Sequence, residues 1–139
     1  MPRLTPYLLF DGNCAEAMRF YQACLGGQLS LTKAGDSPMR AQIPAESHER
    51  VVNARLTSGD LEISASDWLH PTRRPRQGNT TCVYISNASY ADLQRYFGRL
   101  SEGADPDLLD SLTDMPFGSY GALTDKYGVR WMLQGDPAP

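Results

Sequence analysis

Apolar and polar residues recur along this chain with periods that change from segment to segment. Residues 5–10 form an apolar run of strand length, which ends at the turn residues Asp11, Gly12 and Asn13. The next segment, 14–25, has helical periodicity, with Asn13 at a predicted N-cap and Glu16 at capping-box spacing. One face of this helix is apolar and consists of Cys14, Ala17, Met18, Tyr21 and Leu25. The pattern predicts a strand followed directly by a helix that stops at Gly26 and Gly27.

Three further strands are predicted at residues 28–32, 51–56 and 61–65, with a long polar loop at 34–49. The last two strands form a hairpin, and pairing Thr57 with Asp60 would put Arg55 opposite Glu62 and Asn53 opposite Ser64. Alternation gives this hairpin one polar face and one apolar face. We expect the apolar face to consist of Val52, Ala54, Leu56, Leu61, Ile63 and Ala65.

The same order of elements recurs in the second half. Residues 80–85 predict a strand, Ser89 an N-cap, and Leu93, Phe97 and Leu100 a helical stripe, while 107–113, 119–124 and 129–133 predict strands. The chain is therefore expected to be an α+β protein with two βαβββ modules in a single domain. Module 1 covers about residues 1–68 and module 2 about 79–135, with a proline- and arginine-containing linker at about 69–78.

Composition narrows the range of partners. The 139 residues are 41% hydrophobic and 21% charged with a net charge of −3, which argues against nucleic acid and anionic membranes as partners. No apolar run approaches the roughly 20 residues of a membrane helix. Cys14, Cys24 and Cys82 lie in apolar segments without metal-binding spacing, so we interpret them as reduced core thiols. We expect a cytoplasmic protein.

The polar faces of the strands carry the candidate chemistry. In "DKYGVRWML", residues 125–133, alternation sends Arg130 and Met132 to one face and Trp131 to the other, where we expect core. Arg55, Glu62 and Arg130 suggest an anion-binding pocket, although a structural pair of Arg55 with Glu62 is the favoured interpretation of these two residues. The expected apolar lining consists of Tyr7, Cys82, Tyr84 and Met132, and it suits either a planar ligand or a dimer core.

Four pieces of sequence, in this order and spacing, carry a resemblance to a known family: "TPYLLFDGNCAEAMRFYQACLGG", "DSPM", "VVNARLTSGDLEISASD" and "GALTDKYGVRWML". Together they resemble the PhnB-like branch of the vicinal oxygen chelate superfamily, which includes glyoxalase and the bleomycin resistance proteins. The resemblance implies the glyoxalase/bleomycin resistance fold, a curled, cup-shaped mixed sheet with helices on its convex face. It also implies a homodimer.

The resemblance further implies where a metal would bind. Matching the motifs puts Thr5 (or Tyr7), Glu62, Thr80 and Met132 at the four ligand positions, and only Glu62 is a good ligand for a hard cation. Asn53 stands where many PhnB-like sequences have a histidine, while His48 and His70 fall in loops expected to be solvated. A label of methyltransferase would require a site for S-adenosylmethionine, yet no glycine-rich dinucleotide-type turn follows a strand. We therefore expect no metal and no cofactor.

The sequence is compatible with two functions. The first is a metal-free protein that binds a small organic molecule, which could be anionic, in its cup. The second is an enzyme of lyase, isomerase or dioxygenase type that uses Glu62 as an acid/base or metal ligand. The candidate ligand-binding residues are Tyr7, Asn53, Arg55, Glu62, Tyr84, Arg130 and Met132.

Overall fold

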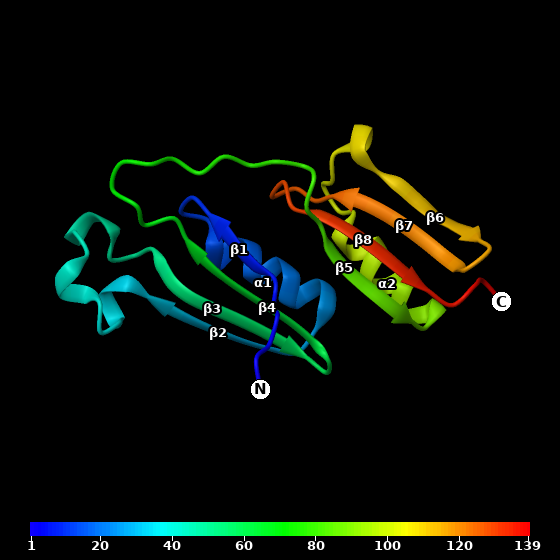
Figure 1. The fold of residues 1–139 in the computed structure, drawn as a ribbon, viewed down its shortest axis with the longest axis horizontal. Helices are drawn as coiled ribbons and strands as arrows, with labels where there is room; N and C mark the ends of the chain where they lie inside the picture. Colours follow the sequence, from blue (N-terminus) through cyan, green and yellow to red (C-terminus); the bar gives the residue numbers. More distant parts are fainter. The chain divides into compact units, whose positions relative to one another are not determined.

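The computed structural model describes all residues 1–139 and divides the chain into two compact units, Met1–Arg76 and Gln77–Pro139. In both, a helix lies against one face of a four-stranded mixed sheet (Figure 1). The predicted α+β class is confirmed, with the order strand, helix and three strands in each half.

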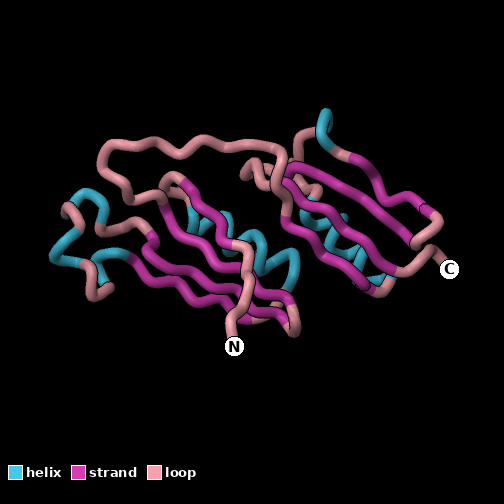
Figure 2. The backbone as a smooth tube through the Cα atoms, in the orientation of Figure 1, coloured by secondary structure: helices cyan, strands magenta, loops and turns pink.

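The first unit contains β1 (Tyr7–Phe10), α1 (Cys14–Leu25), β2 (Gln28–Lys33), β3 (Val51–Ser58) and β4 (Leu61–Asp67). Its sheet has the order β1-β4-β3-β2, with β1 parallel to β4 and the other pairs antiparallel. The predicted loop between β2 and β3 contains three short 3₁₀ helices: η1 (Ala34–Asp36), η2 (Arg40–Gln42) and η3 (Ala45–Ser47) (Figure 2).

The second unit repeats this topology with β5 (Val83–Ala88), α2 (Tyr90–Leu100), β6 (Asp110–Met115), β7 (Gly118–Thr124) and β8 (Arg130–Gly135). A 3₁₀ helix, η4 (Pro106–Leu108), precedes β6. The sheet order is β5-β8-β7-β6, and β5 is parallel to β8. No helix in the structure has the length and apolar composition that crossing a membrane requires.

The core of the first unit lies between α1 and its sheet. All five residues of the predicted apolar stripe of α1 are buried, and the helix contacts β2, β3 and β4. Asn13 occupies the predicted N-cap position of α1, but its side chain makes no capping hydrogen bond. The buried Asp67 carboxylate accepts hydrogen bonds from the amides of Gly12 (2.9 Å), Cys14 (3.0 Å) and Val51 (2.8 Å) instead. One side chain thus joins the ends of β1 and β4 to α1 and β3.

The β3–β4 hairpin has a different register from the predicted one. Ser58 pairs with Leu61, so Gly59 and Asp60 form the tip, and Glu62 lies opposite Thr57 while Arg55 lies opposite Ser64. Gly59 has φ +60°, which suits the first central position of a type II′ hairpin turn. Because the partners move by two residues, this shift of register by itself leaves each side chain on its predicted face.

A β-bulge at the start of β3 changes which of its residues belongs to the apolar face. The pairing of β2 with β3 shifts register between Thr32 and Lys33, so that Thr32 pairs with Asn53 and Lys33 with Val51. Val51 is therefore the buried valine, and Val52 is only half-buried. The extra residue in the strand reverses the alternation at this point.

In the second unit the predicted helix and its cap are confirmed. Ser89 accepts a hydrogen bond from the Asp92 amide at 3.1 Å, and Leu93, Phe97 and Leu100 are buried. Gly121 of β7 lies so close to Phe97 that a Cβ atom would come within 2.8 Å of the ring. The strand β5 begins at Val83 instead of the predicted residue 80, which leaves Thr80 and Cys82 before the sheet.

Candidate functional site

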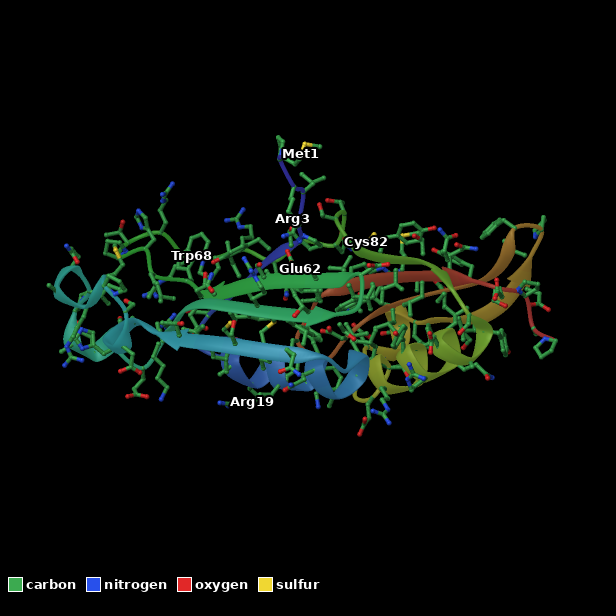
Figure 3. The ribbon with its side chains drawn as sticks, turned by 90° about the horizontal axis from the view of Figure 1, so that it is seen from below. Met1, Arg3, Arg19, Glu62, Trp68 and Cys82 are labelled. Atoms are coloured by element: carbon green, nitrogen blue, oxygen red, sulfur yellow. The ribbon has the colours of Figure 1, made fainter.

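The sheet of the first unit has one face that α1 does not cover, which we call the open face. It is formed by alternate residues of the four strands, and Tyr7, Asn53, Arg55 and Glu62 of the predicted site all belong to it. Figure 3 shows Glu62 on the side of the sheet opposite α1. The local fold therefore brings four predicted site residues to one surface.

Glu62 is held by the segment that precedes β1. Its Oε1 atom lies 2.8 Å from Nη2 of Arg3, and its Oε2 atom accepts a hydrogen bond of 3.3 Å from the Thr5 hydroxyl. The sequence pointed to Arg55 as the partner of this carboxylate, but no Arg55–Glu62 ion pair is present. The hydrogen bond from Arg3 holds the pKa of Glu62 below its usual value, although burial opposes this effect; the charge of Arg3, the Thr5 hydroxyl and Arg55 add to the lowering.

Arg55 is the second charged residue of the open face. Its side chain is exposed and makes no hydrogen bond or ion pair. In the sheet it pairs with Ser30 on β2 and with Ser64 on β4, and Ser64 pairs in turn with Tyr7 on β1. Side chains of these four residues therefore form a row across all four strands, with the guanidinium group inside it.

The remaining predicted site residues lie in the second unit, on the face of its sheet that α2 does not cover. Tyr84 pairs with Met132 across β5 and β8, and Tyr84 is exposed. Trp131 points to the other face, is fully buried, and donates its indole N–H to Asp125 at 2.8 Å. The predicted core position of Trp131 is confirmed.

Arg130 is engaged within its own unit. Its Nη1 atom donates hydrogen bonds to the Leu108 carbonyl (2.6 Å) and the Thr124 hydroxyl (3.4 Å), and Nη2 lies 3.6 Å from the Asp110 carboxylate. These contacts tie β8 to β7 and to the segment that leads into β6. They leave Arg130 less available to a ligand than the exposed Arg55.

The positions that would hold a metal in the superfamily do not fit one here. Thr5 and Thr80 offer neutral hydroxyls, Met132 a thioether, and the one carboxylate, on Glu62, is bonded to Arg3 and Thr5. No three His, Cys, Asp or Glu side chains anywhere in the chain are grouped so that they could hold a metal ion.

The three cysteines differ from one another in burial, and so do the two histidines. Burial, with a contribution from the Asp67 charge, raises the pKa of the Cys14 thiol to about 12, and Cys24 is also buried. Cys82 is exposed, which corrects its expected place in the core. His48, expected to be solvated, is half-buried, and its Nε2 lies 2.9 Å from the Ile43 carbonyl. His70 is exposed as expected.

Sequence reasoning missed two parts of the first unit. Arg3 and its ion pair with Glu62 lie in a segment without periodicity, so no pattern marked them. The second part is a surface pocket bounded by the η2–η3 region and the residues after β4, which includes His70 and Arg74 of the supposed solvated linker. Only the concentration of arginines at 73–76 hinted at it.

Comparison with known proteins supports the resemblance seen in the sequence. Protein YjdN of Escherichia coli (strain K12) is 29% identical over 138 residues, covering 94% of this chain and 92% of YjdN. The crystal structure of protein PA1353 from Pseudomonas aeruginosa has a TM-score of 0.85 and 32% identity, and it covers 99% of this chain and 100% of that chain.

More distant structures share the fold alone. The PhnB protein from Bacillus cereus has a TM-score of 0.70 at 23% identity, with 96% of this chain and 98% of that chain covered. Structures of glyoxalase, bleomycin resistance and fosfomycin resistance type have the same fold. The family model described as 3-demethylubiquinone-9 3-methyltransferase matches residues 2–134. The chain therefore belongs to this family, the PhnB-like branch of the vicinal oxygen chelate superfamily.

Proposed function

We propose that this chain binds a small organic anion on the open face of its first unit, with Arg55 as the residue that recognises the negative charge. The observation that carries the proposal is the unequal state of the two charged side chains on this face. Glu62 already forms an ion pair with Arg3, whereas Arg55 is exposed, makes no ion pair or hydrogen bond, and acts on Glu62 only through its charge. A guanidinium group with free donors is suited to bind a carboxylate or phosphonate in a bidentate manner.

The neighbours of Arg55 support the same ligand class. Ser30 and Ser64 flank it on the adjoining strands and offer hydroxyl groups to the same anion. Tyr7 lies next to Ser64 and is 51% exposed, so its ring can cover an apolar part of the ligand. Asn53, which is also exposed, can donate from its amide.

We also propose that the chain works without a resident metal or cofactor. The family description implies methyl transfer, but the strand–glycine–helix turn between β1 and α1 has its Gly12 and Cys14 amides bound to Asp67, where a cofactor anion would need them. Elemental analysis of purified protein should find no stoichiometric transition metal. One equivalent of metal that survives dialysis and is lost in Glu62→Ala would contradict this part of the proposal.

The alternative, an enzyme that uses Glu62 as an acid or base, receives less support. A general base working near neutral pH needs a pKa close to that pH, and desolvation would have to raise the pKa of Glu62 to meet this need. The contacts from Arg3 and Thr5 lower it instead. Turnover of a bound ligand that disappears in Glu62→Gln while binding persists would favour the enzyme.

A thermal-shift screen of organic carboxylates and phosphonates tests the proposed function, followed by titration of each hit against two variants. Arg55→Met should abolish saturable binding, because it removes the guanidinium group of the open face that makes no ion pair. Arg19→Met is the matched control, since Arg19 is exposed on α1, on the other side of the sheet (Figure 3). A hit that binds Arg55→Met as tightly as the unaltered protein would refute the role of Arg55.

We further propose that the two modules act as one domain in a cytoplasmic homodimer. The family resemblance is the basis for this assembly, and half-exposed apolar side chains on the edge strand β1 are consistent with it.

A further inference from the structure

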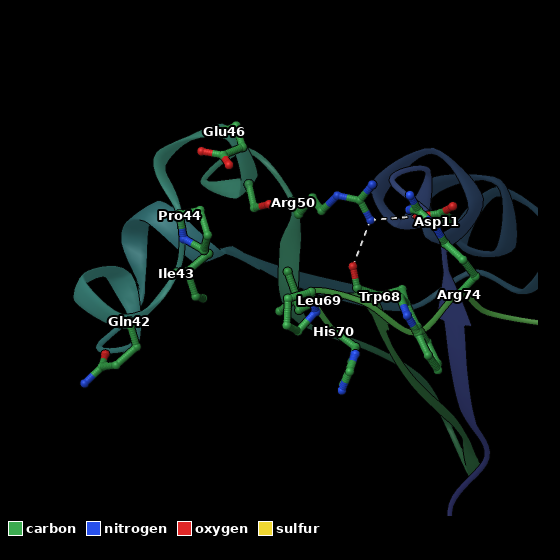
Figure 4. Close-up of a pocket in the computed structure, with 12 residues that line it drawn as sticks. Asp11, Gln42, Ile43, Pro44, Glu46, Arg50, Trp68, Leu69, His70 and Arg74 are labelled. Carbon is green, nitrogen blue, oxygen red and sulfur yellow. Dashed lines mark hydrogen bonds and ion pairs between the residues drawn. The ribbon is translucent and has the colours of Figure 1, made fainter.

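We propose that the first unit contains a second binding site, separate from the open face, which takes a short apolar peptide or a similar zwitterion with its two charges at opposite ends. The site is a surface pocket of about 450 Å³, within the size range of small-molecule sites. It lies where β1 and β4 end and β3 begins, and it includes none of the residues proposed to bind the anion (Figure 4).

One wall of the pocket is the η2–η3 region, which is held in shape by its own hydrogen bonds. The Nε2 atom of His48 lies 2.9 Å from the Ile43 carbonyl and 3.2 Å from the Arg40 carbonyl, so this nitrogen must carry the proton. The Arg40 guanidinium donates to the Gly35 carbonyl at 2.6 Å, and the Gly35 amide donates to the His48 carbonyl at 2.9 Å. The wall is therefore built before any ligand arrives.

The opposite wall is the segment that follows β4. The Trp68 indole N–H donates to the Arg73 carbonyl at 2.6 Å, and His70 Nδ1 accepts from the amides of Thr72 (3.2 Å) and Arg73 (2.8 Å). Arg50 joins the two walls, because its Nη1 donates to Asp11 at 2.9 Å and to the Trp68 carbonyl at 2.8 Å. Figure 4 shows Arg50 between the two groups of lining residues.

The charges of the pocket specify the class of ligand. Arg50 and Asp11 neutralise each other. Two charged residues remain, Glu46 on the first wall and Arg74 on the second, and both are exposed and without an ion pair. Because Nδ1 of neutral His70 is an acceptor, its Nε2–H is a donor on the same wall as Arg74.

Between these charged groups the lining offers the apolar side chains of Ile43, Pro44, Leu69 and Pro71 and the Trp68 ring, together with the polar Gln42 and Ser47. A ligand that complements this surface carries a cation for Glu46 at one end, an apolar body in the middle, and an anion for Arg74 and His70 at the other end. A free dipeptide with apolar side chains has this arrangement, with its ammonium and carboxylate groups at its two ends.

The experiment compares three probes that differ only at their ends: the dipeptide Leu-Phe, its N-acetyl derivative without the cation, and its C-terminal amide without the anion. Binding is followed by the indole N–H resonance of Trp68, since the other tryptophan, Trp131, is fully buried in the second unit. We expect Leu-Phe to bind saturably and each blocked probe to bind about tenfold more weakly, the loss of roughly one charge-assisted hydrogen bond.

Two variants assign each end to its wall. Arg74→Gln should weaken Leu-Phe about tenfold without affecting the amide, and Glu46→Gln should weaken Leu-Phe without affecting the N-acetyl probe. The controls are Arg76→Gln and Glu102→Gln, exposed residues outside the pocket, which should change nothing. Equal affinity for the three probes, no saturable binding of Leu-Phe, or equal losses in the controls would overturn the proposal. Arg55→Met separates the two sites, because it should leave Leu-Phe binding intact.

Discussion

The carboxylate of Glu62 has two partners, and both come from the residues that precede β1. Arg3 and Thr5 stabilise the charged form of this side chain, so its pKa should lie below the ordinary value of 4.5. For a group with a lowered pKa, the stabilising contact is present above the ordinary value and is lost as the pH falls through the value in the folded protein. The Arg3–Glu62 contact should therefore persist at neutral pH and break only below pH 4.5.

A carboxyl-detected NMR titration measures this pKa directly. Arg3→Gln should move the pKa of Glu62 back toward 4.5, because it removes the largest cause of the shift. Glu49, whose pKa is lowered by its hydrogen bond with Lys33, has no contact with Arg3, so its pKa should be the same in both proteins and provides the control. A pKa at or above 4.5 in the unaltered protein would mean that the Arg3 contact does not form in solution.

Single residues also show the limits of what the sequence predicts. Alternation correctly places Tyr7, Asn53, Arg55 and Glu62 on one face, because a strand has a period of two. It does not identify Arg3 as the partner of Glu62, since Arg3 lies in a segment without secondary structure and is 59 positions away. Partners of this kind depend on the path of the chain, which periodicity does not record.

At the level of elements, the strongest periodic segments were predicted best. The apolar stripes of α1 and α2 are buried as expected, and Ser89 caps α2. The hairpin register was wrong because either Ser58-Gly59 or Gly59-Asp60 could form the tip, and both choices keep the apolar residues on one face. The capping contact at the start of α1 was predicted wrongly, because the carboxylate of Asp67, a residue distant in sequence, accepts the hydrogen bond from the first turn in place of the Asn13 side chain.

Two glycines with positive φ provide a test of how closely the elements of the first unit pack. A Cβ atom on Gly27 would lie 2.1 Å from the Thr57 carbonyl and 2.8 Å from the Ser58 Cα, whereas one on Gly59 would meet nothing within 4 Å. Gly27→Ala should cost several kcal/mol, through backbone clash as well as strain, while Gly59→Ala should cost about 1 kcal/mol from strain alone. Urea denaturation gives both values, and equal costs would show that the β3–β4 hairpin can move away from the α1–β2 connection.

At the level of the whole molecule, the sequence predicts the repeated βαβββ topology better than it predicts the two binding sites. Both units have the same strand order and the same parallel first pair, although residue identity between the halves is low. The topology depends on which face of each element is apolar, a pattern that many sequences satisfy. The pocket beside Trp68 depends on individual hydrogen bonds in loops, which the periodicity of the sequence cannot predict.

The assembly state is the last property that can be tested. β1 is an edge strand, and its Leu9 side chain is 51% exposed, an apolar surface that association would remove from water. We expect sedimentation velocity at micromolar concentration to give twice the 15.4 kDa mass of the chain.

Leu9→Glu should shift the protein toward monomer, because a buried carboxylate without a partner is costly. Leu108→Glu, at an exposed leucine on η4, should leave the dimer unchanged. A single 15.4 kDa species over a concentration series would show that the chain is a monomer, and an unaltered dimer in Leu9→Glu would exclude the β1 edge as its interface.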